Sequence, residues 1–61
     1  MSPSELATVK RAIQTLGFES KTRLTRAEIE RLVQELTLNR DYKLADYIQS
    51  LDNATVADLL R

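Results

Sequence analysis

The sequence predicts an all-α fold, a compact three- to four-helix bundle formed by one small domain over residues 1–61. The first observation is a helix-start signal that occurs twice, as Ser2 followed by Glu5 and as Thr25 followed by Glu28. In each pair the hydroxyl can accept a hydrogen bond from a free N–H of the first turn, and the Glu can reach back to the N–H of the capping residue. The second observation is that apolar residues recur at helical spacing, whereas no alternating strand pattern is visible.

The first helix is predicted over residues 3–16. Pro3 suits the first helical position, because the N–H that it lacks would have no partner there. The apolar stripe of this helix consists of Leu6, Val9, Ile13 and Leu16. Gly17, the only glycine, stands where a left-handed residue ends a helix, and Phe18 is placed to fold back on Ile13. Both ends of the first helix are therefore predicted.

A polar loop over residues 17–24 leads to a second helix, predicted over residues 26–36. Its apolar stripe consists of Ile29, Leu32, Val33 and Leu36. This spacing is that of a helix with one buried face, and the opposite face is charged, as is typical of a surface in contact with solvent. Thr37 and Asn39 interrupt the pattern and predict a break after this helix.

The third helix is predicted over residues 40–51, with Asn39 as its capping residue and Asp41 complementing the positive helix end. Its apolar stripe consists of Leu44, Ile48 and Leu51. Because the link before it is short, we expect the second and third helices to be neighbours that run antiparallel or cross steeply.

A fourth, short helix is predicted over residues 54–60, capped by Asp52 or Asn53. If Asp52 is the cap, Leu51 and Val56 are placed to form a hydrophobic staple. The apolar side chains of this helix are Val56, Leu59 and Leu60. A helix of this length is not stable alone, so we expect these side chains to pack on the rest of the bundle.

The composition argues against an enzyme. A chain of 61 residues buries only about 60% of its unfolded surface, too little to surround a deep, water-excluding pocket. The sequence contains no Cys and no His, which removes thiolate metal sites and the usual general base at neutral pH. One glycine cannot form a phosphate-cradling loop, and the acidic residues match no calcium loop. We therefore expect no catalytic residues, no metal and no cofactor.

The charge is balanced but unevenly distributed. Nine basic residues face nine acidic ones, while residues 10–31 hold six basic and three acidic residues. A neutral total supplies none of the bulk attraction typical of nucleic-acid-binding domains. No apolar run is long enough for a membrane span, and Glu5 stands where a signal peptide would be basic. We expect no membrane contact and a cytoplasmic location.

A basic segment over residues 21–31 is the first candidate site. Together with the third helix it would bind nucleic acid through Lys21, Arg23, Arg26, Arg40 and Lys43. The alternative is that these side chains solvate a loop and compensate acidic neighbours. A regular helix-turn-helix is disfavoured, because its spacing places Lys43 and Asp46 where the recognition helix should be apolar.

Tyr42, Asp46 and Gln49 form the second candidate site, since helical spacing places them on one face away from the predicted core. Leu38, just before them, completes this set. An exposed aromatic residue beside polar groups is typical of protein interfaces. The alternative is that Tyr42 bends over the preceding loop and packs on Leu38 or Phe18.

Leu38-Asn39-Arg40-Asp41-Tyr42, following an amphipathic helix, resembles the hairpin of the small helical inhibitors of sporulation histidine kinases. The resemblance covers one turn and a cap and implies no residue roles. It implies only that such hairpins can act by binding proteins.

By elimination, we expect a non-enzymatic protein–protein interaction module, as a small regulator, an adaptor or a terminal domain of a larger protein. A nucleic-acid-binding domain and a homodimerising structural module, which would complete its core by pairing, are the alternatives.

Overall fold

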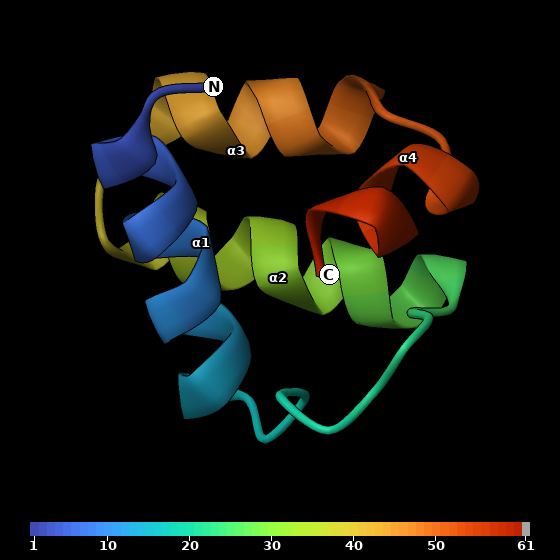
Figure 1. Cartoon of the computed structure of the whole chain (residues 1–61). Coiled ribbons are helices and arrows are strands. Elements are labelled where there is room, and N and C mark those ends of the chain that lie inside the picture. The colour runs from blue at the N-terminus through green and yellow to red at the C-terminus, as the bar shows by residue number, and fades with distance from the viewer. Residues whose placement is uncertain (61) are drawn as a thin grey trace.

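The computed structural model describes residues 1–60 and forms four α-helices there (Figure 1). They are α1 (Pro3–Thr15), α2 (Arg26–Leu38), α3 (Tyr42–Ser50) and α4 (Asn53–Leu59). The described part of the chain contains no strand, so the predicted all-α fold is confirmed. α2 lies in the middle of the molecule and packs against the other three helices.

Both predicted capping boxes are present. At the start of α1, the N–H of Glu5 donates to Ser2 Oγ at 3.3 Å, and the N–H of Ser2 donates to Glu5 Oε1 at 3.0 Å. At the start of α2, the corresponding distances between Thr25 and Glu28 are 3.2 and 2.8 Å. These reciprocal bonds satisfy N–H groups that the helix itself leaves without partners, which is why both helices begin where the sequence predicts.

The end of α1 has the predicted Schellman geometry. Gly17 has a φ of +77°, its N–H donates to the carbonyl of Gln14 at 3.0 Å, and the N–H of Phe18 donates to that of Ile13 at 2.9 Å. These are the two bonds that define the motif. Leu16 is the capping residue rather than part of the helix, so α1 is one residue shorter than predicted.

The end of α2 repeats this geometry without a glycine. Arg40 has a φ of +62°, its N–H donates to the carbonyl of Thr37 at 2.9 Å, and the N–H of Asp41 donates to that of Leu36 at 3.0 Å. α2 therefore continues two residues beyond the predicted end, to Leu38, because the turn satisfies its last carbonyls.

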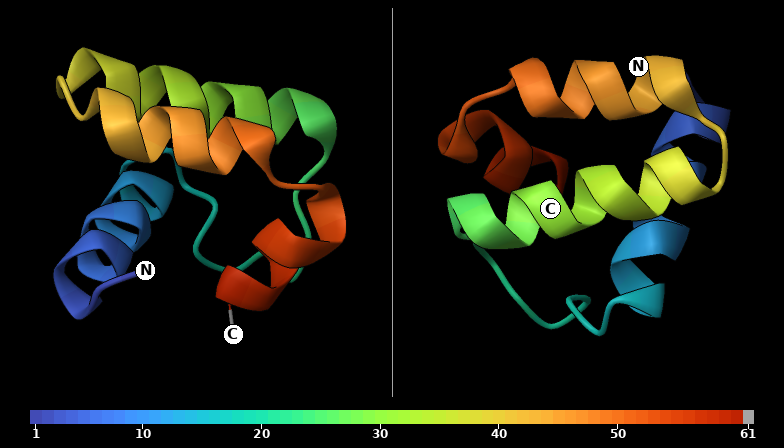
Figure 2. Two further views of the ribbon diagram at one scale, coloured as in Figure 1. Left: turned by 90° about the horizontal axis from the view of Figure 1, so that it is seen from above. Right: turned by 180° about the vertical axis from the view of Figure 1, so that it is seen from behind.

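The capping residue of α3 is also corrected. Asp41, not Asn39, caps this helix, since the N–H of Leu44 donates to Asp41 Oδ1 at 3.4 Å. Asn39 instead ends α2. α3 consequently covers residues 42–50 rather than 40–51. α2 and α3 form an antiparallel hairpin and lie side by side in two directions of view (Figures 1 and 2).

α4 is capped by Asp52, whose Oδ1 accepts from the N–H of Thr55 at 2.7 Å. The helix begins and ends one residue earlier than predicted. Val56 is 1% exposed, and Leu59 and Leu60 are half-buried against the core. The apolar side of α4 therefore packs within the same chain, as predicted.

The core is wholly apolar over the described residues and receives side chains from all four helices. Its members are Val9, Ala12, Ile13, Leu24, Ile29, Leu32, Leu36, Leu44, Ala45, Ile48 and Val56. No polar or charged residue of the described chain is buried. Side chains that could carry a function therefore lie at the surface.

Candidate functional site

The turn between α2 and α3 presents two large apolar side chains to solvent. Leu38 is 78% exposed and Tyr42 is 59% exposed. Leu38 lies nine residues after buried Ile29, which at about 100° per residue places it about 180° away, on the opposite side of α2. Its exposure therefore follows from the geometry of the helix. We call Leu38, Arg40 and Tyr42 the hairpin tip.

Tyr42, Asp46 and Gln49 are all exposed and lie along one side of α3. At about 100° per residue, Asp46 and Gln49 lie about 40° and 20° from Tyr42 around the helix axis. The structure thus brings the predicted set together as one stripe that starts at the hairpin tip. Leu38 and Tyr42 both remain mainly exposed, so neither covers the other.

Arg40 lies between the two exposed apolar residues in a left-handed conformation that L-residues adopt at a cost of about 1–2 kcal/mol. Its predicted role was that of a cation in the basic set. The conformation was missed because the turn contains no glycine, the usual signal for it. Within residues 1–60, neither Arg40 nor Lys43 forms an ion pair.

Lys21 is engaged locally. Its Nζ lies 3.0 Å from Glu28 Oε2 and 5.9 Å from the centre of the Phe18 ring. The ammonium group thus connects the loop to the first turn of α2. This placement agrees with the alternative in which Lys21 compensates an acidic neighbour.

Arg26 joins α2 to the junction between α3 and α4. Its Nη2 donates to the carbonyl of Gln49 at 3.2 Å, and its Nη1 donates to the carbonyl of Leu51 at 3.0 Å. A further bond of 3.3 Å runs from Nη1 to Asn53 Oδ1. The guanidinium thereby satisfies carbonyls at the end of α3, an interaction across more than twenty residues that no sequence pattern indicated.

The predicted nucleic-acid-binding residues do not form one surface. Arg26 starts α2, whereas Arg40 and Lys43 follow its other end. The twelve residue steps of α2 span about 18 Å at 1.5 Å per residue. The structure therefore divides the basic set into two groups separated by the length of a helix.

Within residues 1–60, the carboxylates whose pKa values are lowered all take part in helix caps. The N–H of Thr25 and then the ammonium of Lys21 lower the pKa of Glu28 below its ordinary value of 4.5. The side chain and then the N–H of Thr55 lower the pKa of Asp52 below 3.8. Hydrogen bonds that favour the charged form cause both shifts.

Glu5 follows the same rule, because the N–H and side chain of Ser2 lower its pKa. No group of three potential metal ligands occurs within the described residues. None of the helices described is sufficiently long and apolar to cross a membrane.

All three described carboxylates with a lowered pKa, Glu5, Glu28 and Asp52, lie at helix starts. Their shifts are therefore explained by the hydrogen bonds that begin the helices.

Comparison with known proteins gives no relative: no protein-family model, curated protein or solved structure matches the chain. The surface of this four-helix domain is therefore the guide to its function. Its most distinctive feature is the hairpin tip.

Proposed function

We propose that this chain is a non-enzymatic protein-binding module that contacts its partner through the hairpin tip. The observation that carries the proposal is the 78% exposure of Leu38, a large apolar side chain on the face of α2 opposite the core. Tyr42 and Arg40 adjoin it, and Tyr and Arg are enriched among residues that dominate binding energy. A partner that covered the tip would remove Leu38 and the Tyr42 ring from water.

The absence of buried polar residues from residues 1–60 supports a non-enzymatic role. General acid–base catalysis needs a group whose pKa is tuned by burial or by neighbouring charge. The displaced carboxylates of this chain are instead held in the charged form by caps. We infer that the domain acts by contact, as a small regulator, an adaptor or part of a larger protein.

Nucleic acid is an alternative partner. Arg40 and Lys43 are exposed at or near the hairpin tip, and neither forms an ion pair among the described residues. We rank this alternative lower, since the other predicted nucleic-acid-binding residues, Lys21, Arg23 and Arg26, lie at the other end of α2. A second copy of the chain is a further alternative, because two hairpin tips could cover each other.

The proposal is tested by placing a photo-reactive phenylalanine analogue at position 38 or 42 in the source cell. The control carries the analogue at position 7, on the exposed side of α1. We expect irradiation to join the chain to one defined protein from positions 38 and 42, and not from position 7.

The mass of the cross-linked product distinguishes the alternatives. A product of twice the 7.0 kDa chain mass would identify the homodimer instead. Cross-links to nucleic acid from position 42 would favour that alternative. Equal cross-linking from all three positions would show that the tip has no special role.

A further inference from the structure

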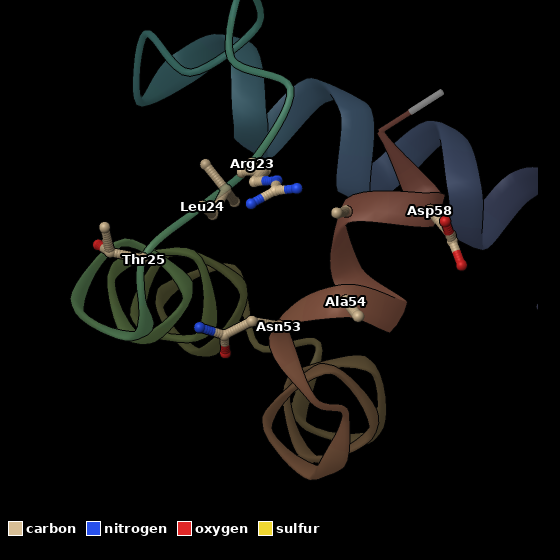
Figure 3. Close-up of a pocket in the computed structure, with 7 residues that line it drawn as sticks. Arg23, Leu24, Thr25, Asn53, Ala54 and Asp58 are labelled. Carbon is tan, nitrogen blue, oxygen red and sulfur yellow. The ribbon is translucent and has the colours of Figure 1, made fainter.

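A second surface lies away from the hairpin tip, where the segment before α2 passes α4. It is a groove of about 570 Å³ (Figure 3). Its lining residues are Arg23, Leu24, Thr25, Asn53, Ala54, Ala57 and Asp58. A volume of about 300–1,000 Å³ is typical of sites that hold a small ligand or part of a peptide.

Arg23 supplies the groove with a charge that the fold does not use. Its guanidinium is directed into the space between the loop and α4 (Figure 3). Within residues 1–60, it takes part in no hydrogen bond, ion pair or ring contact. Lys21 and Arg26, its basic neighbours in the sequence, are both engaged in structural contacts. Only Arg23 of these three is available to a ligand.

Three of the other lining residues are apolar, and Thr25 is occupied by its capping box. Leu24, Ala54 and Ala57 provide apolar walls, and alanine side chains permit close approach of another backbone. The Thr25 hydroxyl accepts from the N–H of Glu28 within its capping box.

The remaining polar residues of the lining, Asn53 and Asp58, form no hydrogen bond or ion pair with Arg23. Asn53 Oδ1 accepts from Arg26. Asp58 also lines the groove, and its carboxylate is directed away from Arg23 (Figure 3). The groove therefore combines apolar walls with one guanidinium and, directed away from it, one carboxylate.

We propose that this groove binds an acidic segment of a partner protein, whose carboxylate pairs with Arg23 while a small apolar side chain lies against Ala54 and Ala57. A guanidinium presents parallel N–H groups that match a carboxylate and is only weakly hydrated, so this pairing suits a partly apolar groove. Nucleic acid is disfavoured, because phosphates in series need several cations and Arg23 alone faces the groove. The proposal is independent of the function assigned to the hairpin tip.

The experiment is an NMR titration of the full chain with a blocked hexapeptide of alternating Glu and Ala. We expect saturable shifts of the Ala54 and Ala57 backbone amides. Arg23→Gln should weaken binding about tenfold or more, as expected for loss of a charge-assisted hydrogen bond. Arg31→Gln is the matched control, since it removes the same charge from the exposed side of α2 and should bind like the wild type.

Two further titrations separate the proposal from general charge attraction. The same hexapeptide with Gln in place of Glu should not bind measurably, and equal binding would overturn the role of the carboxylate. Equal weakening by Arg23→Gln and Arg31→Gln would overturn the site. A short single-stranded oligonucleotide that shifted the same amides at lower concentration than the peptide would overturn the class of partner. Circular dichroism should show unchanged helix content in both variants, because neither guanidinium forms a hydrogen bond or ion pair with another described residue.

Discussion

Gly17 and Arg40 occupy the same position in two helix ends, immediately after the capping residue and at positive φ. A Cβ at Gly17 would meet no atom within 4 Å, so the backbone conformation rather than space favours glycine there. At Arg40 the same conformation is adopted by a residue with a Cβ. The hairpin tip therefore retains a strained residue in its turn.

Arg40→Gly should increase the free energy of unfolding by about 0.5–1 kcal/mol, because glycine removes the left-handed strain but loses more chain entropy on folding. Chemical denaturation measures the change. Arg40→Ala is the control, since it removes the guanidinium but keeps the Cβ, and it should leave stability close to that of the wild type. Equal stabilisation by both substitutions would show that the charge, not the conformation, is unfavourable.

Glu28 makes the stability of α2 depend on pH. Its pKa is lowered in the folded state, so its contribution is complete above the ordinary value of 4.5 and is lost as the pH falls through the lower folded value. Glu28→Gln retains a capping acceptor without this titration. We expect the variant to lose less stability than the wild type between neutral and acidic pH, measured by thermal unfolding. Identical pH dependence of the two proteins would contradict the assignment.

At the scale of elements, α2 organises the bundle through both of its ends. Its C-terminal turn leads into antiparallel α3, and its first residue, Arg26, donates to carbonyls at the end of α3. The second interaction links the start of α2 to the junction between α3 and α4. Lysine cannot reproduce it, because a single ammonium lacks the planar fork of the guanidinium.

Arg26→Lys should therefore lower the free energy of unfolding by about 1 kcal/mol, the usual contribution of such hydrogen bonds. Arg31→Lys, on the exposed side of the same helix, should change stability by less than about 0.5 kcal/mol. Urea denaturation compares the two. If they behave alike, the bonds from Arg26 contribute nothing to stability in solution.

Local signals in the sequence predicted most of these elements. Capping boxes, the glycine end of α1 and the apolar stripes depend on residues within one or two turns, so their spacing is visible in the chain. Asn39 was misassigned because Asn39 and Asp41 are both good caps, and the choice depends on how the turn satisfies the carbonyls of α2. The contacts of Arg26 and the groove at Arg23 join segments distant in sequence, and no local pattern encodes them.

At the scale of the whole molecule, α4 completes the core. Val56 is 1% exposed, and the half-buried Leu59 and Leu60 pack beside it. Deletion of residues 54–61 should lower the free energy of unfolding by a few kcal/mol. This follows from about 1.5–3 kcal/mol per fully buried Val or Leu, less the entropy of ordering the segment. Thermal unfolding provides the measurement. An unchanged melting temperature with lost partner binding would make α4 a docking element instead.

Some features of the candidate sites could be predicted from the sequence, and others could not. Tyr42, Asp46 and Gln49 share a side of α3 because helical periodicity alone determines it. The separation of Arg26 from Arg40 by the length of α2 required only the helix bounds. In contrast, the sequence does not show which of Lys21, Arg23 and Arg26 forms hydrogen bonds or ion pairs in the folded chain. That Arg23 forms none among the described residues could be seen only in the structure.

The central claim is that the hairpin tip serves binding and not folding. Leu38→Gln tests it most directly, because glutamine has a helix propensity close to that of leucine but no apolar side chain. The measurement is the amount of the partner, identified beforehand by cross-linking, that the wild type and the variant each retain per amount of folded protein. We expect Leu38→Gln to keep a stability within about 0.5 kcal/mol of the wild type and to reduce partner retention about tenfold or more. Full retention by a folded Leu38→Gln variant would contradict it.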